Sequence, residues 1–180
     1  MPNTTFMESG TDATQDFTFW SSTTGTISSA TDQSYTGPRS IKLSTGSPAV
    51  QGTFARSGVL ADAGRRISFR LRFDRLPNGS VQLFQNLTSA DAAVHTIWLD
   101  QFGLLQNVPL GATAVNGTTL LAANTWYRIT LSYTITSTTS FRFELYINGI
   151  FENSATAGTL TRTGTSNLRL IVTTLAGADF

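Results

Sequence analysis

One predicted strand places an aromatic and an acidic side chain on the same face. Polar and apolar residues alternate in 94–100, so Val94, Thr96, Trp98 and Asp100 point to one side of that strand. An indole ring packs against the CH surface of a sugar, and a carboxylate accepts hydrogen bonds from sugar hydroxyls. We therefore expect Trp98 and Asp100 to belong to a glycan-binding surface. The alternative is an ordinary sheet surface with Trp98 packed beneath a loop.

Two other predicted strands carry polar side chains on their outward sides. Arg70 and Arg72 point away from the apolar side of 67–73, and Gln82 and Asn86 alternate along the next strand. If these outward sides belong to one sheet, the four side chains surround Trp98 with a polar surface. The sequence then predicts that all six residues contact a glycan.

Residues for acid–base or nucleophilic catalysis are scarce. The only glutamates are Glu8, Glu144 and Glu152, whereas glycoside hydrolysis needs two carboxyl groups flanking one bond. Glu144 shares a strand face with Arg142, which favours a solvated ion pair. A lone His95 gives little basis for a zinc site or a catalytic triad. We expect no catalytic residues and no enzymatic activity, and a glycan-active hydrolase or lyase is the alternative from another class.

Composition excludes several other classes of protein. The chain has 180 residues, no Cys and a net charge of +1. Without Cys there is no disulfide framework, zinc knuckle or cysteine nucleophile. The near-neutral charge predicts no nucleic-acid partner and no anionic membrane surface, and no apolar run is long enough for a transmembrane helix. No signal peptide is visible at the N-terminus, and we expect one domain over 1–180.

Period-2 alternation of apolar and polar residues dominates the chain and predicts β-strands. It is clearest in 67–73, 127–135, 141–147 and 168–172. Weaker patterns predict further strands at 4–8, 17–20, 25–29, 40–44, 49–56, 80–87, 94–100, 104–108 and 118–121. Short helical turns fit only 59–65 and 88–93. Asn148-Gly149 follows a strand directly and predicts a tight hairpin. Many short strands with one apolar face each indicate an all-β fold of two antiparallel sheets packed as a jelly-roll sandwich.

Motifs in this order resemble those of the concanavalin A-like (laminin-G-like) jelly rolls. The runs are FMESG, GPRSIKL, ISFRLRF, NTWYRI and FELYING, at 6–10, 37–43, 67–73, 124–129 and 143–149. The resemblance covers nearly the whole chain and implies a non-catalytic branch of that superfamily. It also implies one more strand after Phe180. We therefore expect an open edge beside 167–174, covered by the N-terminal strand, a loop or a strand from another copy.

The same resemblance implies a structural Ca²⁺ near the first and last strands. The acidic residues in those places are Glu8, Asp12, Asp16 and Asp179. Calcium is bound by six to eight oxygen atoms, several of them from carboxylates or carbonyls. The alternative is that these acids only solubilise loops or cap turns, and we expect no other cofactor.

These observations lead to one main functional hypothesis and one structural alternative. The main hypothesis is a surface-displayed jelly-roll module that recognises glycans, located outside the cell or on a virion surface as a capsid decoration or tail-associated protein. The alternative is a purely structural assembly subunit that a neighbouring copy completes by strand exchange. The expected partners are thus a glycan or neighbouring subunits, with a homo-oligomer as one outcome.

Overall fold

The fold is known from a computed structural model. It describes the backbone at 22–24, 26–30, 40–44, 50–55, 65–73, 75–77, 79–88, 93–137, 140–157 and 165–172. It describes side chains at 66, 68–73, 75–77, 79–85, 94–134 and 140–156. Within these ranges all regular structure is β-strand, and no helix long and apolar enough to cross a membrane is found there.

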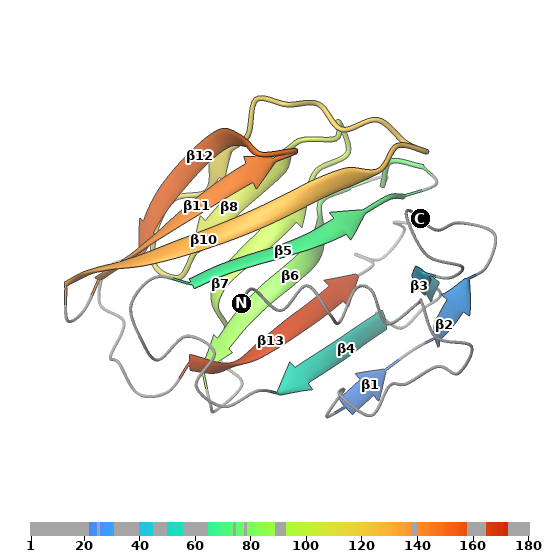
Figure 1. Cartoon of the computed structure of the whole chain (residues 1–180), viewed down its shortest axis with the longest axis horizontal. Helices are drawn as coiled ribbons and strands as arrows, with labels where there is room; N and C mark the ends of the chain where they lie inside the picture. The colour runs from blue at the N-terminus through green and yellow to red at the C-terminus, as the bar shows by residue number, and fades with distance from the viewer. Residues whose placement is uncertain are drawn as a thin grey trace.

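The strands form two main sheets and a small third one (Figure 1). The seven-stranded sheet has, in spatial order, β1 (Ser22–Thr24), β4 (Val50–Ala55), β13 (Thr165–Val172), β6 (Val81–Thr88), β7 (Ala93–Leu99), β8 (Leu105–Pro109) and β9 (Val115–Asn116). The four-stranded sheet has β12 (Ile150–Ala157), β11 (Ser140–Ile147), β10 (Tyr127–Ser137) and β5 (Arg65–Leu71). The third sheet pairs β2 (Thr26–Ala30) with β3 (Ser40–Ser44). Neighbouring strands are antiparallel throughout.

The two main sheets face each other across an apolar core. Phe69 of β5 stacks on Phe84 of β6 with ring centroids 5.9 Å apart. Ile97, Leu99 and other inward side chains of β7 and β8 are fully buried in the same core. The predicted all-β sandwich of two antiparallel sheets is therefore confirmed.

The alternation predicted for 67–73 is confirmed where side chains are described. Phe69 and Phe73 are buried, and Leu71 packs against the core from a partly buried position. Arg70 and Arg72 are half-buried and outside the core, and Arg72 Nη2 donates to Asn124 Oδ1 at 2.7 Å. The register of this strand therefore follows from its hydrophobic pattern.

Two predictions of local structure need correction. Residues 118–121 are not a strand, because Glu152 and Gly103 hold their backbone N–H groups outside any ladder. Helical turns were predicted at 59–65 and 88–93. Of these residues the structure describes only Arg65, Thr88 and Ala93, which belong to strands β5, β6 and β7. The predicted strands at 4–8 and 17–20 also lie outside them.

The expected open edge beside the last strand does not exist. Strand β13 lies inside the seven-stranded sheet and pairs with β4 on one side and β6 on the other (Figure 1). The expectation was wrong because it took the last strand in sequence for an edge strand in space. Its ladder groups find partners within the chain, so no strand from another copy is needed there.

Candidate functional site

Trp98 lies on the outer face of the seven-stranded sheet. Its neighbours in β7, Ile97 and Leu99, point into the core and have an exposed fraction of 0%. Trp98 is directly opposite Gln82 of β6 and Gln106 of β8. Gln106 is in turn opposite Asn116 of β9. An indole thus stands in a row with three planar amides across four neighbouring strands, which we call the tryptophan row (Gln82, Trp98, Gln106 and Asn116).

Exposure differs along this outer face. Trp98, Gln82 and Gln106 are half-buried, and Asn116 is exposed. Thr96, two residues before Trp98 in β7, is buried. Gln85, also buried, donates from Nε2 to Gln82 Oε1 at 3.1 Å and so orients that amide. The tryptophan row is therefore the part of the face that a ligand can reach.

Asp100 follows the same strand and stabilises the turn after it. Its Oδ1 accepts hydrogen bonds from the backbone N–H groups of Phe102 and Leu104, at 2.9 and 2.8 Å. The side chain is buried and closes the turn between β7 and β8, as aspartates commonly do in turns. Its contact with a glycan stays a prediction, and the structure gives Oδ1 other partners.

The predicted arginines do not join Trp98. Arg70 belongs to β5 and Arg72 follows it, so both lie with the four-stranded sheet, whereas Gln82 and Trp98 lie on the seven-stranded sheet. The six residues could form one glycan-binding surface only if their outward sides belonged to the same sheet. They belong to two different sheets. Among the five predicted glycan contacts whose side chains are described, only Gln82 and Trp98 lie opposite each other.

The remaining predicted residues cannot be placed by side chain. Asn86 lies in β6 opposite His95, and its side chain lies outside the described residues. The four acids of the proposed calcium site, Glu8, Asp12, Asp16 and Asp179, also lie outside them. Among the side chains that are described, no group of three or more metal-ligating residues comes together. The calcium site stays a prediction.

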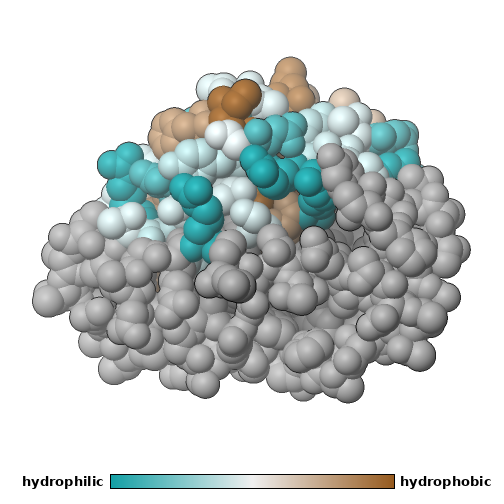
Figure 2. Space-filling model, in the orientation of Figure 1, coloured by the Kyte–Doolittle hydropathy of each residue, from teal (hydrophilic) through white to brown (hydrophobic). Residues whose placement is uncertain are grey.

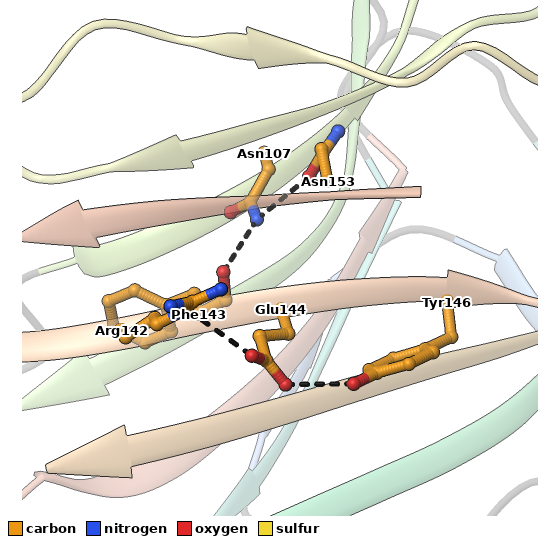
Figure 3. A network of polar contacts seen from close by, with 6 residues as sticks. All are labelled: Asn107, Arg142, Phe143, Glu144, Tyr146 and Asn153. Atoms are coloured by element: carbon orange, nitrogen blue, oxygen red, sulfur yellow. Dashed lines mark hydrogen bonds and ion pairs between the residues drawn. The ribbon is translucent and has the colours of Figure 1, made fainter. Parts of the chain in front are cut away.

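His95 is sealed between the two sheets. Its ring stacks on Phe143 of β11 with centroids 4.1 Å apart, and its exposed fraction is 1%. Asn107 Nδ2 donates to the Phe143 carbonyl oxygen and to Asn153 Oδ1, both at 3.1 Å (Figure 3). Because the amide protons of Asn107 have these acceptors, its Oδ1 accepts from His95 Nε2 at 2.6 Å. Burial lowers the pKa of His95 to about 4, and the hydrogen bond to Asn107 opposes that effect only in part.

The outward side of β11 carries a second polar group. Arg142 Nε lies 3.2 Å from Glu144 Oε1, and Tyr146 donates its hydroxyl proton to Glu144 Oε2 at 2.8 Å (Figure 3). That hydrogen bond raises the pKa of Tyr146, so the phenol stays protonated and donates. Glu144 thus forms an ion pair with Arg142, in line with the structural alternative that the sequence favoured.

Glu152 holds the segment after β9. Its carboxylate accepts hydrogen bonds from the backbone N–H groups of Thr118 and Thr119, at 2.9 and 3.0 Å, and from both threonine hydroxyls. Partial burial pushes the pKa of Glu152 upward, but these hydrogen bonds outweigh it and hold the pKa below its usual value. Glu144 and Glu152 therefore serve different segments.

Gln106 and Asn116 were missed by the sequence reasoning. The strand 104–108 was predicted, and its alternation puts Gln106 on the side opposite to buried Leu105 and Asn107. That signal alone would have marked Gln106 as outward. Its position beside Trp98 depends on the pairing of β7 with β8, which alternation does not reveal.

Comparisons with known proteins identify similar folds and no family. No protein-family profile matches the sequence, and no curated protein is similar to it. A similar solved structure is the endo-β-1,4-glucuronan lyase from the fungus Trichoderma reesei, with a TM-score of 0.64 and 13% identity over 85% of this chain and 79% of that one. A Trypanosoma rangeli sialidase mutant displaying trans-sialidase activity has a TM-score of 0.59 and 13% identity over 89% of this chain.

A third similar structure is that of botulinum neurotoxin type C, whose cell entry depends on interaction with two ganglioside molecules. Its TM-score is 0.61 and its identity is 13% over 86% of this chain. The chain spans only 38% of that neurotoxin chain and 28% of the sialidase mutant. At these identities the likeness establishes a shared β-sandwich.

The expectation that the chain belongs with non-enzymatic proteins is contradicted by these comparisons. A lyase and sialidases stand among the solved structures that share its fold. The expectation rested on the scarcity of carboxylate pairs, and that criterion covers only one chemistry of glycan cleavage. Proteins with this fold thus include enzymes as well as a ganglioside-interacting toxin.

Proposed function

We propose that the protein is a carbohydrate-recognition sandwich that binds a glycan on the tryptophan row. The observation that carries the proposal is the register of Trp98 between Gln82 and Gln106. An indole face packs on the apolar side of a pyranose, and amides on either side match pairs of sugar hydroxyls with a donor and an acceptor each. The similar lyase, sialidase and ganglioside-interacting proteins support a carbohydrate ligand.

The charge of the row favours a neutral stretch of glycan. Its four side chains are uncharged, and Asp100, the nearest acid along β7, bonds its own turn. A row across four strands spans about 14 Å at the usual strand spacing, which is the length of two to three sugar units. We therefore propose an extended oligosaccharide lying across the strands as the ligand. Membership of the concanavalin A-like superfamily and a place on a virion or extracellular surface are part of the same proposal.

Trp98→Ala tests the proposal directly. A glycan array with the purified chain first identifies a ligand, and calorimetry then compares the wild type with the variant. We expect Trp98→Ala to abolish measurable binding, because the stacking surface is lost, and Gln106→Ala to weaken it by about tenfold. The melting temperature should change by only a few degrees because the indole lies outside the core cluster.

Trp126→Ala is the matched control. It removes the same side chain from another half-buried position, immediately before β10 of the four-stranded sheet, and should leave binding unchanged. If Trp98→Ala instead costs about 3–5 kcal/mol of stability, as large core truncations do, Trp98 is a packing residue and the proposal fails. Equal loss of binding in both variants would also reject it.

A further inference from the structure

The outer face of the four-stranded sheet is rich in arginine. Arg66 and Arg70 of β5, Arg128 of β10 and Arg142 of β11 alternate with inward residues and point away from the core. Glu144 is the one acidic side chain described on that face. Among the side chains that the structure describes, four arginines and one glutamate therefore share this face. We call this surface the arginine face; it consists of Arg66, Arg70, Arg128, Arg142, Glu144, Tyr146 and Phe151.

Small hydroxyl side chains form the floor of this face. Ser68 and Thr130 are directly opposite each other, and their hydroxyl oxygens lie 2.8 Å apart. Thr130 is only 6% exposed although it points outward, because longer side chains enclose it. Arg66 and Arg70 stand two residues before and after Ser68, about 7 Å away along the strand on either side. The floor therefore lies between positive charges.

Aromatic rings close one end of the floor. Tyr146 lies beside Thr130 in register, and Phe151 lies beside Tyr146 on the next strand. The two rings meet edge to face, with centroids 5.6 Å apart, and Phe151 is 50% exposed. The guanidinium carbon of Arg66 is 5.5 Å from the centre of the Tyr146 ring. Figure 2 shows hydrophilic and hydrophobic side chains intermingled on the sandwich face turned to the viewer.

Arg128 is held toward the aromatic end. A Cβ atom on Gly149 would lie 2.9 Å from Arg128 Nη2, so the guanidinium rests against the bare backbone of the β11–β12 turn. Asn148 also accepts a hydrogen bond from the Arg128 backbone N–H at 2.9 Å. Arg128 is directly opposite Arg70.

We propose that the arginine face is a second binding site, for a carboxylate-bearing polysaccharide. Sugar carboxylates lie over the Ser68–Thr130 floor and pair with Arg128 and Arg66, while a sugar ring packs on Phe151. The planar guanidinium forms two parallel hydrogen bonds with a carboxylate, a geometry that lysine cannot offer. The site lies on the opposite side of the sandwich from the tryptophan row and does not depend on the function proposed there.

The arrangement favours an acidic polysaccharide over nucleic acid. Nucleic-acid binding draws mainly on many phosphate contacts, and a chain with a net charge of +1 offers a short positive patch only. Glu144 lies inside the patch and would repel a continuous run of phosphates. A polymer with one carboxylate per sugar and apolar ring faces between them matches both the spaced arginines and the exposed Phe151.

Binding of polygalacturonate oligosaccharides to the full chain tests this site. We expect Arg128→Gln and Phe151→Ala each to weaken binding by about tenfold, because one removes a charge-assisted pair and the other a stacking surface. Arg75→Gln is the matched control, since it removes the same charge from an exposed arginine outside this face and should change the affinity by less than about twofold. Trp98→Ala should leave polygalacturonate binding unchanged.

Other probes separate the possible sources of an anion. Neutral dextran should not bind at the arginine face, and a single-stranded oligonucleotide should not displace polygalacturonate. The proposal is overturned if Arg75→Gln weakens binding as much as Arg128→Gln, or if Phe151→Ala has no effect. It is also overturned if only dextran sulfate or the oligonucleotide binds. Thermal melts of each variant confirm folding, which we expect because Phe151 and Arg128 are exposed.

Discussion

Two polar clusters contact strand β11, one buried between the sheets and formed by Asn107 and Asn153 of its neighbours, the other on its own outward side (Figure 3). On the inward side, Asn107 donates to Asn153 and to the Phe143 carbonyl where almost no solvent reaches. On the outward side, Arg142 and Glu144 keep 46% and 22% of their side-chain surface exposed. A buried polar group without its partner keeps its full desolvation cost, whereas an exposed one regains water. Burial, rather than the number of contacts, therefore decides what each group contributes.

The largest expected difference between the two sides comes from the aromatic residues. Phe143→Ala should lower the free energy of unfolding by about 3–5 kcal/mol, because it leaves a cavity beneath His95. Tyr146→Ala, three residues along the same strand, should cost about 1 kcal/mol because its ring packs on exposed Phe151. Urea denaturation measures both. If both variants lost the same free energy of unfolding, burial would not distinguish the two sides of β11.

The next effect is a pH dependence that comes from buried His95 on the inward side. His95 is the one histidine, and its pKa of about 4 in the folded protein lies below the usual 6.5. Between these values the unfolded chain binds a proton that folded His95 does not, so stability falls as pH falls. The loss approaches roughly 3 kcal/mol near pH 4. Above about pH 6.5 neither state is protonated, and His95 adds no pH dependence.

Two measurements check this pH dependence. NMR titration of the single imidazole should give a folded pKa well below 6.5. The free energy of unfolding should fall between pH 6.5 and 5 in the wild type and stay nearly level in His95→Gln, which keeps a donor toward Asn107. A folded pKa near 6.5 would mean that water reaches the ring between the sheets.

A smaller effect is expected for Glu152, which lies between the two extremes of burial. Glu152→Gln keeps one oxygen for the N–H donors of Thr118 and Thr119, but it makes these hydrogen bonds neutral and turns its NH₂ group toward the Thr119 hydroxyl, so it should cost about 1–2 kcal/mol. Because its pKa is lowered, the carboxylate's contribution is present above the usual pKa of glutamate and is lost as pH falls through the folded value. Faster amide exchange at 117–119 in the variant would locate the effect, and unchanged exchange there would contradict it.

The smallest effect is expected on the outward side. Glu144→Gln makes the same chemical change as Glu152→Gln but breaks a solvated ion pair and keeps an acceptor for Tyr146. It should change the free energy of unfolding by less than about 1 kcal/mol. Chemical denaturation of the two variants side by side measures the contrast. A larger loss for Glu144→Gln than for Glu152→Gln would reverse the ranking by burial.

Local pattern predicted the strands that matter most for the core. The alternation around Phe69 and Phe143 identified their inward positions, and Asn148-Gly149 forms the expected hairpin, with φ angles of 54° and 90°. It also marked Trp98 as outward, because Ile97 and Leu99 flank it. The side to which a strand residue points follows from alternation with a period of two, and the tight turn follows from the backbone freedom of glycine. Both properties are set by residues that are close together in the sequence.

Phe151 shows where local pattern was insufficient. Strict alternation would place it on the same side as Asn153 and Ala155, which are buried. A bulge between β11 and β12 leaves Glu152 without a cross-strand partner, so Phe151 comes to lie beside outward Tyr146 and Glu152 reaches the threonines after β9. The aromatic end of the arginine face and the hydrogen bonds of Glu152 therefore both depend on this bulge.

The sequence by itself determined an all-β chain, the inward and outward sides of its main strands and a sharp hairpin. These properties depend on backbone sterics and on burying one apolar side of each strand. Only the tertiary structure decided which strands became neighbours. It separated Arg70 from Trp98, brought Gln106 beside that indole, and enclosed the last strand, β13, between β4 and β6. Strand order depends on the packing of segments distant in sequence, and a period of two carries no information about it.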